Sequence, residues 1–211
     1  MKTIPATKPT FSNDDISFIT NNFSDILSGK SFLSQYKFCS QFEKEFASYT
    51  GSDFAISCNS GTSALELIFK ALDVEGKEII LPSNTFIATA NAIMNAGGIL
   101  VFADCDESMC LDYHDAINKI TPLTAAICHV HIGGIVSDGA LKLAQYCEKN
   151  SLFFVEDAAQ AHGSKNKGIQ AGTLGIAAGF SFFSTKVITT GEGGMVTTDD
   201  EELVNKMKSI R

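Results

Sequence analysis

Three separate stretches of the sequence carry side chains that could do chemistry together. Lys186 follows an apolar run shortly after Ser181, and Asp157 follows the apolar run Phe153-Phe-Val-Glu156. The third stretch, Asn59-Ser-Gly-Thr62, links a strand-like segment to a helix-like one. An amine can attack a carbonyl carbon, a carboxylate can pair with a cationic nitrogen, and backbone N–H groups at a helix start can bind phosphate.

Each of these signals is weak when it stands by itself. A lone lysine is most often a surface charge, and Ser60 or Thr62 can simply cap a helix. Taken together, an amine, an acid and a phosphate cradle are the fixtures that pyridoxal phosphate needs. The combination therefore favours a site for that cofactor over three unrelated surface features.

Four motifs occur in a fixed order along the chain: Asn59-Ser-Gly-Thr62, Glu156-Asp-Ala-Ala-Gln-Ala-His-Gly163, Ser181-Phe-Phe-Ser-Thr-Lys186 and Thr190-Gly-Glu-Gly-Gly194. In this order they resemble the motifs of the DegT/DnrJ/StrS sugar aminotransferases, which are fold-type I pyridoxal phosphate enzymes. The resemblance runs from about Pro5 to Arg211. It implies a three-layer α/β/α fold with a mostly parallel sheet, the large domain of a fold-type I aminotransferase.

The resemblance also assigns roles to single residues. Lys186 would be the Schiff-base lysine and proton shuttle, and Asp157 would hold the pyridine nitrogen protonated. Six further residues would bind the cofactor: Ser60, Gly61, Thr62 and Ser181 at the phosphate, Phe86 against the ring, and Gln160 at the phenolic oxygen. For Phe86 the competing interpretation is ordinary core packing.

The reaction that the resemblance implies is transfer of an amino group, with glutamate as donor, to a keto group of a nucleotide-linked deoxysugar. Such an enzyme would serve cell-surface polysaccharide biosynthesis as a homodimer. The lysine is retained at position 186, which disfavours the dehydratase branch of the family, where a histidine replaces it.

Two other interpretations stay open. Members of the family continue into a small C-terminal domain that this sequence lacks, so the chain could be a truncated, inactive fragment or one half of a split aminotransferase. A nucleotide-binding Rossmann protein would need a Gly-x-Gly-x-x-Gly turn after its first strand, which Asn59-Ser-Gly-Thr62 does not provide.

Composition bounds the partners and the compartment. The 211 residues are 45% hydrophobic and carry a net charge of −8, which argues against nucleic acid as a partner. No apolar stretch approaches the roughly 20 residues that span a bilayer. The six cysteines form no C-x-x-C pair, which favours reduced thiols and a cytoplasmic protein.

Strand-like and helix-like segments must position the three reactive stretches. The alternation predicts strands at 54–58, 78–82, 99–103, 125–130, 152–156, 180–183 and 195–198, with helices between most of them. Residues 1–30 are predicted to form an extended arm and a helix, and residues 31–211 the cofactor-binding domain. His129 and His131 are expected near the rim of the site without a metal, and His162 is expected to be a packing histidine.

Overall fold

The computed structural model describes residues 8–211, so most of the predicted extended arm lies outside the described residues. The helices are α1 (Asn13–Leu27), α2 (Lys37–Thr50), α3 (Gly61–Ala71), α4 (Ile87–Asn95), α5 (Tyr113–Asn118), α6 (Asp138–Lys149) and α7 (Glu201–Ile210), with a 3-10 turn η1 at Ile132–Gly134. The strands are β1 (Phe54–Cys58), β2 (Glu78–Pro82), β3 (Ile99–Ala103), β4 (Thr124–Val130), β5 (Phe153–Asp157), β8 (Ala177–Ser181) and β9 (Gly194–Thr198), with the short pair β6 (Lys165–Asn166) and β7 (Ile169–Gln170).

Seven strands form one twisted sheet in the order β1-β9-β8-β5-β4-β2-β3. Strands β3, β2, β4, β5 and β8 pair in parallel, and β9 runs antiparallel to its neighbours β1 and β8. The mostly parallel sheet predicted from the alternation of elements is therefore confirmed. Carboxyl ends of parallel strands share one edge of a sheet, which is where such folds bind ligands.

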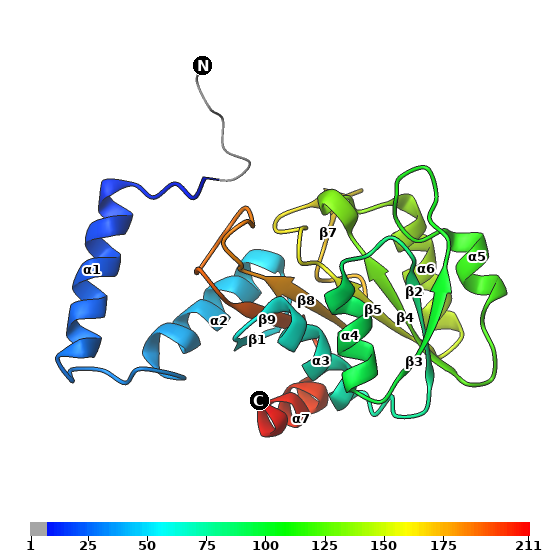
Figure 1. The fold of residues 1–211 in the computed structure, drawn as a ribbon, viewed down its shortest axis with the longest axis horizontal. Helices are drawn as coiled ribbons and strands as arrows, with labels where there is room; N and C mark the ends of the chain where they lie inside the picture. The colour runs from blue at the N-terminus through cyan, green and yellow to red at the C-terminus, as the bar shows by residue number, and fades with distance from the viewer. Residues whose placement is uncertain (1–7) are drawn as a thin grey trace, which may run out of the picture.

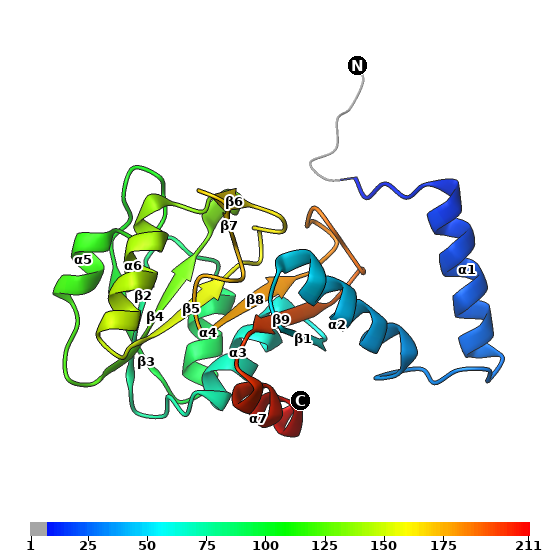
Figure 2. The same ribbon diagram turned by 180° about the vertical axis from the view of Figure 1, so that it is seen from behind.

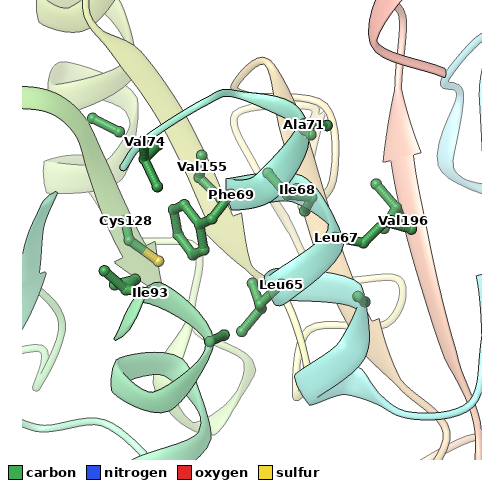
Figure 3. Close-up of a cluster of buried hydrophobic side chains, with 14 of the residues drawn as sticks. Leu65, Leu67, Ile68, Phe69, Ala71, Val74, Ile93, Cys128, Val155 and Val196 are labelled. Atoms are coloured by element: carbon green, nitrogen blue, oxygen red, sulfur yellow. The ribbon is translucent and has the colours of Figure 1, made fainter. Parts of the chain in front are cut away.

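Helices cover both faces of this sheet, so the domain has three layers. Figure 1 shows α3 and α4 in front of the sheet, and Figure 2 shows α2, α5 and α6 on the other face. Helix α3 places Leu65, Ile68 and Phe69 on one buried stripe, because positions i, i+3 and i+4 lie on one side of a helix. In Figure 3 these side chains meet Val155 of β5 and Ile93 of α4, which seals α3 onto the sheet.

Helix α1 stands apart from the three layers. Ser12 and Asp15 form a capping box at its start. No residue of α1 is buried, and Figure 1 shows the helix connected to the body only through the segment before α2. None of the helices in residues 8–211 is long and apolar enough to cross a bilayer.

The strand that leads to Lys186 lies earlier than predicted. The predicted strand was 180–183, with Phe180, Phe182 and Phe183, whereas β8 spans Ala177–Ser181. Small residues open this strand because α3 lies directly on it: a β-carbon at Gly179 would be 2.9 Å from Leu65.

Candidate active site

Asp157 lies at the carboxyl end of β5 and is 6% exposed. Its Oδ2 accepts a hydrogen bond from the Thr89 hydroxyl at 2.6 Å, and its Oδ1 accepts one from the backbone N–H of Ala159 at 3.1 Å. Burial raises the pKa of this carboxyl above its ordinary value, while the two hydrogen bonds and the charges of His131 and Lys186 oppose the rise. Within residues 8–211 no cation forms an ion pair with it. A buried carboxylate without a paired cation is suited to pairing with a positively charged group of a ligand.

Thr89 is a site residue that sequence reasoning missed. It is fully buried in α4, and its hydroxyl lies 2.7 Å from that of Thr85 one turn earlier. The chain from Thr85 through Thr89 to Asp157 orients the carboxylate. The i, i+4 spacing of the two threonines was the available signal, but threonines at that spacing are common on helix surfaces.

Lys186 lies in the turn that follows β8, where its backbone N–H donates to the Phe183 carbonyl at 2.9 Å. The residue is half-buried, and its charge lowers the pKa values of both Asp157 and His162. Such an effect requires the amine to lie near both groups. The structure therefore brings together the predicted amine and the predicted acid, which are 29 residues apart in the sequence.

The start of α3 lies next to the end of β8. A β-carbon on Gly61 would be 2.7 Å from the β-carbon of Ser181, so only glycine allows this approach. Ser60 caps the helix, since its hydroxyl accepts from the backbone N–H of Ser63 at 3.1 Å. In the described chain, the backbone N–H groups of Gly61 and Thr62 have no acceptor. The capping interpretation thus holds for Ser60, and two N–H donors stay free for an anion.

Gln160 and Phe86 lie on the loops that flank Asp157. The Gln160 side-chain oxygen accepts from the backbone N–H of Gly133 at 2.8 Å, which leaves its amide N–H₂ group free to donate to another molecule. Phe86 precedes α4 and is 71% exposed. This exposure excludes core packing for Phe86 and leaves its ring available to cover a ligand.

The histidines differ from what the sequence suggested. His129 and His131 are fully buried, so neither lies at a rim of the site. His162 packs against Phe180 and Phe182, as expected, but its buried ring nitrogens have no hydrogen-bond partner in residues 8–211. Its ring lies 5.2 Å from that of Phe182, and burial lowers its pKa to about 4.

A groove of about 1000 Å³ lies beside the site, between α2, α3 and α7. Asn59 and Ser63 at the start of α3 and Gly194 of β9 line it, but Asp157 and Lys186 do not. No group of three or more His, Cys, Asp or Glu side chains in residues 8–211 is arranged to hold a metal ion. The residues that meet at this edge of the sheet are thus an amine, an acid and backbone N–H groups that can bind an anion.

Comparison with known proteins gives one consistent result. Residues 13–211 match the DegT/DnrJ/EryC1/StrS aminotransferase family. The chain is 43% identical over 177 residues to the GDP-perosamine synthase of Caulobacter vibrioides, an alignment that covers 83% of this chain and 47% of that protein. The chain spans about half the length of the curated relatives it matches.

Two solved structures share the fold closely. Helicobacter pylori PseC, an aminotransferase involved in the biosynthesis of pseudoaminic acid, has a TM-score of 0.90 and 31% identity, with 98% of this chain and 55% of that chain covered. A putative sugar aminotransferase from Streptococcus pneumoniae in its PLP-form has a TM-score of 0.88 and 28% identity, with 98% and 57% covered. The described layers and strand order are thus those of known aminotransferases.

Proposed function

Because the chain belongs to the DegT/DnrJ/EryC1/StrS aminotransferase family, we propose that it carries out pyridoxal phosphate-dependent transfer of an amino group to a keto group of a nucleotide-linked sugar. Glutamate is the proposed donor. The relative named as a GDP-perosamine synthase supports a nucleotide-linked sugar as the acceptor. The observation that carries the proposal is the buried carboxylate of Asp157, which has no paired cation among residues 8–211 and lies near Lys186.

The residues present fit the cofactor. Gly61 leaves room beside Ser181, and the free N–H groups at the start of α3 can hold a phosphate dianion together with the Ser181 and Thr62 hydroxyls. Asp157 can hold a ring nitrogen protonated, and Phe86 can cover one face of the ring. When bound, pyridoxal phosphate supplies an aldehyde that reacts with amines and a ring that accepts electrons from the carbon undergoing reaction.

Each residue then has a defined task. The Lys186 amine anchors the cofactor and, once free, takes and returns a proton as a general base and acid. Thr89 orients the Asp157 carboxylate through its hydrogen bond. The amide N–H₂ of Gln160, which has no partner in the described part of the chain, can donate to the cofactor's phenolic oxygen.

A second copy of the chain is the proposed partner. Three apolar side chains of α1 are exposed to solvent: Ile16 (52%), Phe23 (55%) and Leu27 (69%). A row of exposed apolar side chains is unfavourable in a monomer and is typical of a protein–protein contact. Light scattering is expected to give twice the mass of one chain. The alternative result is the mass of one chain, which doubles only after a polypeptide matching the C-terminal half of the relatives is added. This result would identify a separate C-terminal half as the partner.

The half-reaction with the amino donor tests the function. Purified protein loaded with pyridoxal phosphate is mixed with glutamate, and 2-oxoglutarate and the visible spectrum are followed. One equivalent of 2-oxoglutarate per bound cofactor, with loss of the visible band, is expected. A protein that binds the cofactor but forms neither 2-oxoglutarate from glutamate nor 2-oxoglutaramate from glutamine would refute amino-group transfer and support the interpretation as an inactive fragment.

A further inference from the structure

Adjacent carboxylates of β5 lie on opposite faces of the sheet. Asp157 faces Thr89 of α4, whereas Glu156 is fully buried on the other face against His131. Glu156 accepts four hydrogen bonds: from His131 Nε2 at 2.9 Å and from the backbone N–H groups of Gly172 (2.8 Å), Leu174 (2.8 Å) and Gly175 (3.3 Å). Hydrogen bonds from three backbone donors favour the ionised form of a carboxyl group.

The ring of His131 faces an acceptor at each nitrogen. Nε2 lies 2.9 Å from the Glu156 carboxylate, and Nδ1 lies 3.3 Å from the carbonyl oxygen of Ile135. A ring that donates at both contacts carries a proton on each nitrogen and is an imidazolium. Because the side chain of His131 is fully buried, a charge on its ring would be little screened by water.

His131 follows the last residue of β4, next to the end of β5 that carries Asp157. The backbone N–H of His131 donates to the Asp157 carbonyl at 3.0 Å, and β4 pairs with β5 at Val130 and Asp157. The charge of His131 opposes the burial that raises the pKa of Asp157. An opposite charge within several ångströms favours the ionised form of a carboxyl group.

We propose that His131, held as an imidazolium by Glu156, is a positioning residue whose charge keeps the Asp157 carboxylate ionised. The inference rests on the proposed function in one respect: there, the ionised carboxylate pairs with the ring nitrogen of the cofactor. It adds a buried ion pair on the far face of the sheet to the residues that prepare the site.

Other titratable groups around this pair are neutral or act in the same direction. The ring of His129 packs edge-to-face on that of His131 with centroids 5.0 Å apart, and burial holds its pKa well below the ordinary value. Burial raises the pKa values of Cys110, whose sulfur lies 3.7 Å from the Ile135 carbonyl, and of Cys128, which lies near Asp157. Lys186, on the opposite side, also favours ionised Asp157.

Nuclear magnetic resonance of the cofactor-free protein tests the proposal. With ¹⁵N-labelled histidine at pH 7, both ring nitrogens of His131 are expected to be protonated, and Glu156→Gln is expected to return the ring to a single proton. With ¹³C-labelled aspartate, His131→Gln is expected to raise the titration midpoint of the Asp157 carboxyl by about one pH unit, a tenfold change in proton affinity. The matched variant His129→Gln removes a neighbouring buried histidine and is expected to leave the midpoint in place.

Two results would overturn the proposal. One is a singly protonated His131 ring in the wild-type protein, a measurement that requires no variant to fold. The other is an equal rise of the Asp157 midpoint in His131→Gln and His129→Gln, which would assign the effect to packing. Pyridoxal phosphate binding is measured separately: failure to bind the cofactor, with the imidazolium present, would refute the proposed function and leave the charge arrangement standing.

Discussion

Gly61 of α3 lies against Ser181 of β8 so closely that a β-carbon on Gly61 would be 2.7 Å from that of Ser181. Gly61→Ala is therefore expected to push Ser181 away and to weaken pyridoxal phosphate binding about tenfold or more, measured by equilibrium titration. The control is Gly139→Ala, which also lies in the first turn of a helix but whose nearest neighbour would be an ordinary 3.4 Å away. Equal losses of affinity in both variants would contradict a phosphate cradle at Gly61.

Thr89→Val removes the hydroxyl that donates to Asp157 and keeps the shape of the side chain. The expected loss of unfolding free energy is about 1–2 kcal/mol, because a buried acceptor loses its partner. Cofactor affinity is expected to fall as well. Thr197→Val is the control: its buried hydroxyl donates to the Gly172 carbonyl, so it should cost similar stability and leave affinity unchanged. Unchanged affinity in Thr89→Val would remove this residue from the site.

Phe86→Ala separates ring stacking from folding. Because Phe86 is 71% exposed, denaturant unfolding should show a change of less than about 0.5 kcal/mol. Loss of stacking should weaken cofactor binding by about threefold to tenfold. Ile87→Ala, at a neighbouring apolar position that is 61% exposed, should leave affinity unchanged. A large loss of stability in Phe86→Ala would instead identify a packing role.

His162 predicts a pH dependence of stability. Burial lowers its pKa from 6.5 to about 4, so the folded protein binds this proton more weakly than the unfolded chain does. The associated stability is fully present above pH 6.5 and is lost as the pH falls towards 4, by about 2–3 kcal/mol. His162→Leu should reduce this loss in urea unfolding, whereas His114→Leu, at an exposed position, should not. Parallel curves for wild type and His162→Leu would contradict the assignment.

Much of the site could be predicted because its residues follow strand ends. Asp157 ends an apolar strand, and Lys186 follows another, so the order of the motifs was enough to expect them at one edge of a parallel sheet. Strand β8 was displaced in the prediction because Ala177, Ala178 and Gly179 have little strand preference of their own. Gly179 is small because Leu65 of α3 packs closely on it, a tertiary requirement that no local pattern expresses.

Thr89 and Glu156 could not be assigned from the sequence for a different reason. Their partners are far away in the chain: Thr89 contacts Asp157, and Glu156 contacts His131 and the backbone of Gly172 to Gly175. A neighbouring pair of acids gives no sign of which one faces the site. Only the direction of each side chain from β5 separates the roles.

The central claim is that Lys186 anchors pyridoxal phosphate at the edge where Asp157 and the start of α3 meet. The direct measurement is the visible absorption of protein mixed with pyridoxal phosphate and then dialysed, for wild type, Lys186→Ala and the control Lys165→Ala, which changes an exposed lysine on β6. Wild type and Lys165→Ala are predicted to keep the band and Lys186→Ala to lose it. A band that survives in Lys186→Ala, or a wild-type protein that stays colourless, would contradict the account.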